Sequence, residues 1–111
     1  MEEMIREIIE ELTTELSETE GDKFNLSLLT AKVKGAYREV KTAKKYPATY
    51  TDAAIERDMV NYYSQVRNIA LYDYNQIGAE GQTQYNQDGV SVHYVDRDKL
   101  FYGVLPVALR G

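Results

Sequence analysis

Apolar residues recur every three or four positions along the first part of the chain, and this spacing predicts amphipathic helices. Ile8 and Leu12 share one face of the first stretch, while glutamates occupy most of its remaining surface. The second stretch begins after Asn25 or Ser27, either of which can cap a helix, and Pro47 ends it. We therefore expect three helices, over about residues 2–19, 26–46 and 52–77.

The third expected helix has the clearest start, because Thr51 is a favourable N-cap and Tyr50 can pack on Ile55. Apolar residues then spread over much of its circumference until Gly78. Two other helices cover only part of so wide an apolar face. We expect either the C-terminal tail or another subunit to cover the rest.

Beyond Gly78 the chain becomes polar and rich in glycine, which is unfavourable for a helix. Asp88 followed by Gly89 favours a tight turn, and the next residues, from Val90 onward, have the short alternation of a strand. This pattern predicts a β-hairpin over about residues 82–95.

The expected fold class is mainly α: a small three-to-four-helix bundle with a long third helix, a short β-hairpin and an extended C-terminal tail. The tail covers residues 96–111 and begins with a short helix or turn over 96–102. A chain of 111 residues and 12.7 kDa is expected to form a single domain, residues 1–111. Its apolar runs are too short to cross a membrane, and its acidic N-terminus is unlike a secretory signal, so we expect a soluble protein without a membrane partner.

The sequence offers little for catalysis or metal binding, since it contains one histidine and no cysteine. His93 has no neighbouring group in the sequence for acid–base work, and we expect a partly exposed strand residue. Asp88, Asp96 and Asp98 lack the ordered spacing of a calcium loop. We expect no catalytic residue, no cofactor and no metal site, and therefore not an enzyme.

Charge is segregated along the chain. Residues 1–22 contain nine acids and one base, whereas residues 23–45 contain seven bases and one acid. Such a layout favours contacts between copies in one orientation, because complementary potentials steer association. The basic second helix also fits the phosphates of a nucleic acid, so a nucleic-acid-binding regulatory module is the alternative.

Tyrosine is abundant, with ten residues in 111, and most of them lie in the second half. Tyrosine combines a large apolar body with a polar tip and is enriched where proteins meet proteins. Several tyrosines can instead line the core. We expect Tyr63, Tyr72 and Tyr85 to contribute to interfaces.

Residues 68–83 (NIALYDYNQIGAEGQT) and 85–94 (YNQDGVSVHY) resemble the head–tail connector (adaptor) proteins of tailed bacteriophages and prophages. The similarity extends from about Ile55 to Pro106, and the helical first half agrees in length and order. The resemblance implies a non-catalytic virion protein that forms a ring beneath the portal and connects it to a stopper or tail-completion protein. The genome would pass through the ring, and the protein would reside at the head–tail junction and, during assembly, in the host cytoplasm.

On this interpretation two sets of residues are candidate contact sites. The apolar tail residues are assigned to docking on the portal or another partner, or alternatively to the subunit's own core: Val104, Leu105, Val107 and Leu109. Basic residues of the second helix are expected to line the channel or to pair with acids of the next subunit: Lys32, Lys34, Lys41 and Lys45 with Glu7, Glu11 and Glu15. An enzyme of unrecognised type is a third alternative.

Overall fold

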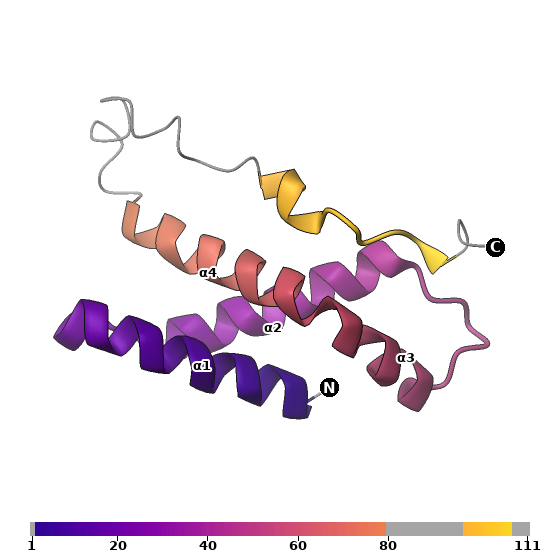
Figure 1. Ribbon diagram of the computed structural model, residues 1–111, viewed down its shortest axis with the longest axis horizontal. Coiled ribbons are helices and arrows are strands. Elements are labelled where there is room, and N and C mark those ends of the chain that lie inside the picture. The colour runs from indigo at the N-terminus through magenta and orange to yellow at the C-terminus, as the bar shows by residue number, and fades with distance from the viewer. Residues whose placement is uncertain (1, 80–96, 108–111) are drawn as a thin grey trace.

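The computed structural model describes residues 2–79 and 97–107 and shows a helical bundle (Figure 1). Its helices are α1 (Glu2–Glu20), α2 (Leu26–Lys44), α3 (Asp52–Met59) and α4 (Tyr63–Ala79), with short 3-10 segments η1 (Gly21–Lys23), η2 (Val60–Tyr62) and η5 (Arg97–Phe101). α1 and α2 run antiparallel, and η5 lies along α4 on the side away from α1. The mainly helical class predicted from the periodicity is confirmed.

Caps define the ends of α2. The Asn25 side chain accepts a hydrogen bond from the Leu28 backbone N–H at 2.9 Å, which confirms the first of the two caps considered for this helix. At the other end Lys45 adopts the left-handed conformation, with φ of 50° and ψ of 55°. α2 therefore ends at Lys44, two residues before the predicted end, because a left-handed residue turns the backbone out of the helix.

The third helix is not continuous, contrary to the prediction for residues 52–77. It begins as expected, with Thr51 Oγ1 accepting from the Ala54 N–H at 3.1 Å, but the 3-10 segment η2 separates α3 from α4. A 3-10 turn places residues three apart on the same side. Met59 and Tyr62 have this spacing, and both are buried.

The core lies where α2 and α4 pack together, with α1 against both. Its fully buried side chains include Leu12, Leu29 and Ile69. The tail covers part of the wide apolar face of α4: Val104 is buried, and Phe101 packs against the same core. The first of the two expected covers, the tail, is therefore present within the chain.

The predicted hairpin over residues 82–95 lies outside the described residues, as does His93. Within 2–79 and 97–107 there is no strand, and no helix of these segments is long and apolar enough to span a membrane. The short helix or turn expected over 96–102 corresponds to η5.

Candidate functional site

The most exposed large apolar side chains of the tail lie together just after η5. Tyr102 is 87% exposed and Leu105 is 55% exposed. They border a shallow cavity of about 630 Å³ on the tail. We call this region the tail surface; the residues that line it are Asp98, Lys99, Phe101, Tyr102, Gly103, Val104 and Leu105.

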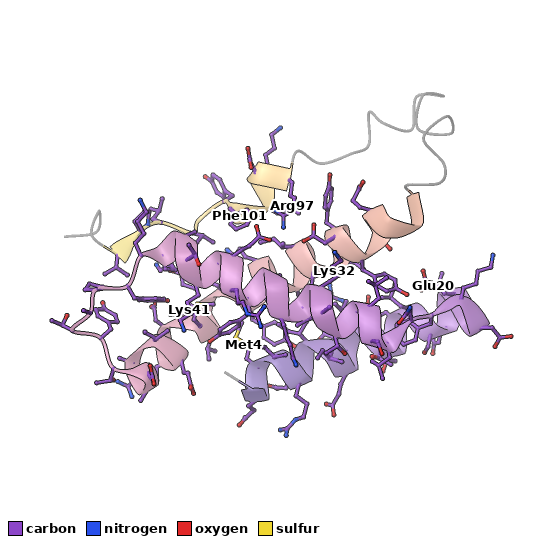
Figure 2. The ribbon with its side chains drawn as sticks, turned by 180° about the vertical axis from the view of Figure 1, so that it is seen from behind. Met4, Glu20, Lys32, Lys41, Arg97 and Phe101 are labelled. Carbon is purple, nitrogen blue, oxygen red and sulfur yellow. The ribbon has the colours of Figure 1, made fainter. Side chains whose placement is uncertain are left out.

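Arg97 holds the start of the tail against two helices. Its Nε and Nη2 donate to the Asp73 carboxylate of α4, both at 2.8 Å, and its Nη1 and Nη2 donate to Glu39 of α2 at 3.0 and 2.6 Å. Hydrogen bonds to Asp73 and then to Glu39 raise the pKa of Arg97 against the opposing effect of desolvation. The guanidinium also lies 5.7 Å from the centre of the Phe101 ring (Figure 2).

The four apolar tail residues have different environments. Val104 is 8% exposed and belongs to the subunit's own core, which is the alternative considered for it. Leu105 is exposed, and Val107 is half-buried. Leu109 lies outside the described residues. Of the three that the structure describes, Leu105 is thus the side chain most available to a partner.

The candidate basic residues of α2 also fall into two groups, those that line a cavity and those that do not. Lys41 and Lys45, together with Arg38, line a cavity of about 590 Å³ between α2 and α3. We call it the cationic groove; its lining residues are Tyr37, Arg38, Lys41, Thr42, Lys45, Tyr46 and Ile55. Lys34 is exposed and Lys32 is half-buried, and neither lines this groove. Figure 2 shows Lys32 and Lys41 along α2.

Glu7, Glu11 and Glu15 were expected to pair with a second subunit. Two of these three side chains already have partners in the same chain. Arg67 of α4 donates through Nε to Glu11 and through Nη2 to Glu15, which ties α1 to α4. The Tyr63 hydroxyl donates to Glu11 Oε2 at 3.3 Å. Glu7 is exposed and lines a separate cavity of about 370 Å³.

Two of the three candidate interface tyrosines lie within the described residues, and both are less exposed than an interface role suggested. Tyr63 and Tyr72 are both half-buried on α4, and Tyr63 packs against the core. Tyr85 lies outside the described residues. These positions therefore place no tyrosine on a fully exposed face, in contrast to Tyr102.

Lys44 belongs to the basic helix α2, but the structure buries it completely. Its Nζ donates to the Tyr62 hydroxyl at 2.6 Å and lies 3.8 Å from Asp58 Oδ2. The Tyr46 hydroxyl donates to the same Asp58 oxygen at 2.7 Å. A buried ammonium needs such partners because desolvation strongly disfavours an isolated charge. This cluster joins the end of α2 to α3 and η2, beside the cationic groove.

Alkaline pH is expected to destabilise the protein. Burial, then the hydrogen bond to Asp58, raises the pKa of Tyr46 above its ordinary value of 10.0, and burial is also the main cause of the raised pKa of Tyr74. Above pH 10 the unfolded chain loses these protons first, so it binds fewer protons than the folded chain and stability falls. The loss should approach about 1.4 kcal/mol per pH unit for Tyr46.

Urea unfolding across this pH range, followed with tyrosinate absorbance, measures the effect. Tyr46→Phe should reduce the pH dependence, because the substitution removes one ionisable group. Equal unfolding free energies at about pH 9 and about pH 11 would contradict the expectation.

Comparison with known proteins gives no relative for this chain: no family model, no curated protein and no solved structure matches it. Among residues 2–79 and 97–107 no group of acidic or histidine side chains is placed to hold a metal ion.

Proposed function

We propose that the protein is a head–tail connector, a non-catalytic virion subunit that assembles as a ring beneath the portal and joins it to the stopper or tail. The resemblance of residues 68–94 to that family is the starting point. A helical bundle that carries a separate C-terminal docking segment is compatible with such a role. The genome would pass through the ring without sequence-specific contacts.

The tail surface is the observation that carries the proposal. Tyr102 and Leu105 are exposed on a segment that Arg97 anchors to α2 and α4. Exposed aromatic and aliphatic side chains on an anchored segment are typical of protein docking sites, because little conformational entropy is lost on binding. A portal or tail-completion protein would bind this surface.

The test is binding to the portal protein encoded in the same phage or prophage genome. Tyr102→Ser combined with Leu105→Ser should weaken portal binding by about 100-fold, since two apolar anchors are lost. Leu26→Ser is the matched control, because Leu26 is 51% exposed on α2 and lies away from the tail surface. Sedimentation of the protein with portal rings measures the binding.

Wild-type protein that never binds the portal would refute the connector function. Portal binding that is equally weakened by the Leu26 control would refute the tail surface as its site. Thermal unfolding of all variants checks that they remain folded.

A nucleic-acid-binding module is the second candidate, favoured by the three cations of the cationic groove. It predicts duplex binding that weakens steeply with salt, because bound cations release counterions from phosphates. Binding of this kind by a protein that never binds the portal would favour the second candidate.

A further inference from the structure

The cationic groove carries positive charge that no acidic side chain of residues 2–79 and 97–107 pairs with. Arg67, Arg97 and Lys44 all lie against acidic side chains. In contrast, Arg38 and Lys41 form no ion pair with the residues that the structure describes, and neither does Lys45. The lining of the groove is partly apolar, with Tyr37 and Ile55 beside the cations. A partner that binds this groove should therefore carry acidic side chains on a partly apolar surface.

α1 carries a row of acidic side chains that likewise lack an ion pair with described residues. Glu3, Glu7 and Glu10 are exposed and form no ion pair with any described residue. Their spacing of four and then three residues places them along one side of the helix. We call them the acidic ridge. A helix is convex, so this ridge has the shape to enter a groove between two other helices.

The spacing of the two sets matches when one helix is reversed. The cations follow one another by three and then four residues, and the glutamates, read from Glu10 back to Glu3, do the same. An antiparallel alignment pairs Arg38 with Glu10, Lys41 with Glu7, and Lys45 with Glu3. Glu18, Glu15 and Glu11 repeat this spacing, but Arg67 of the same chain already binds Glu11 and Glu15.

We infer that the cationic groove of one copy binds the acidic ridge of a second copy in this antiparallel register. This inference deepens the proposed function and rests on it, since a ring needs a contact between copies. The contact joins two different surfaces, so it is head-to-tail and can continue from copy to copy. Within one chain α1 already runs antiparallel to α2 (Figure 1). Rotation about an axis along the helices keeps that direction, as in a ring.

A nucleic acid fits the groove less well than a second copy. Tyr37 also lines the neighbouring cavity, whose charged lining residues are three acids and one base: Glu3, Glu7, Glu56 and Arg57. A phosphate chain that continues from the cations along α2 would meet these carboxylates and be repelled.

Disulfide trapping tests the register, because the chain contains no cysteine of its own. Thr42 is exposed and lines the groove, and the alignment places it opposite Arg6 of the second copy. A mixture of Thr42→Cys and Arg6→Cys chains should form the mixed disulfide about tenfold faster than a mixture of Thr42→Cys and Thr14→Cys chains. The Thr14 control is likewise exposed on α1 and lies eight residues, about two turns, out of register.

Charge reversal tests the pairing itself. Lys41→Glu in the Thr42→Cys chain should slow the mixed disulfide, and Glu7→Lys in the Arg6→Cys chain should restore it, because the pair is then reversed. Added salt should slow the wild-type pairing. Each variant is compared with wild type by thermal unfolding, so that a loss of folding is recognised.

Equal rates for the Arg6 and Thr14 mixtures, or no restoration by the reversed pair, would overturn the inference. Loss of duplex binding by Lys41→Glu with no change in trapping would also overturn it and assign the groove to phosphates. The trapping uses no portal. In-register trapping without portal binding would therefore refute the connector function alone, and portal binding without trapping would refute the contact alone.

Discussion

Asp58→Ala is expected to lower the free energy of unfolding by about 3 kcal/mol, a large effect for a side chain that is 21% exposed. The substitution removes the carboxylate beside the fully buried Lys44 ammonium and the acceptor of the Tyr46 hydroxyl. The Tyr62 hydroxyl remains within 2.6 Å of Nζ, but a neutral oxygen does not compensate the charge.

Lys44→Met distinguishes the loss of pairing from the loss of packing. Methionine keeps much of the volume of the lysine side chain and brings no charge into the core, so the change should cost about 1 kcal/mol or less. Introduced into Lys44→Met, the Asp58→Ala change should cost much less than it does alone. Urea unfolding of the four proteins gives the coupling. Additive effects would contradict the assignment of Lys44 and Asp58 to one electrostatic cluster.

Arg97→Ala is expected to cost about 2 kcal/mol and to release the tail from the bundle. The change removes four charge-assisted hydrogen bonds that link η5 to α2 and α4. It leaves Glu39 and Asp73 without their shared cation. Arg97→Lys should recover only part of the loss, because an ammonium cannot form two parallel pairs of hydrogen bonds.

Amide hydrogen exchange shows which segment loses protection when Arg97 is replaced by alanine. Amides of residues 97–107 should lose protection, whereas those of α1 should change little, since the hydrogen bonds of Arg97 go to α2 and α4 and not to α1. Arg6→Ala is the control for loss of an exposed arginine. Uniform loss of protection over the whole bundle would show that the tail is not a separately opening unit.

Local chemistry was sufficient to predict much of the fold. Asn25 and Thr51 cap the helices that follow them, and the apolar spacing indicated the buried face of α1. The break at Val60–Tyr62 was not predictable in this way, because a single 3-10 turn barely disturbs the spacing of apolar residues. Helix periodicity therefore describes the buried side of a helix better than its continuity.

The polar clusters depended on contacts between distant segments. Lys44 continues the stripe of Val33, Tyr37 and Val40, and a lysine on an apolar stripe indicates a buried partner. Its position in the last helical turn instead favoured a surface role. Asp73 of α4 binds Arg97, and the sequence alone did not indicate this partner, which lies 24 residues further along the chain.

The left-handed backbone conformation at Lys45 favours glycine, whereas the positive charge of the groove depends on the lysine side chain. A residue with a Cβ at φ of 50° is strained by about 1 kcal/mol relative to glycine, which is the residue most often found there. Glycine at this position would relax the helix end but would remove a cation from the rim of the groove. The protein thus keeps a conformational penalty at the rim of the groove that Lys45 lines together with Arg38 and Lys41.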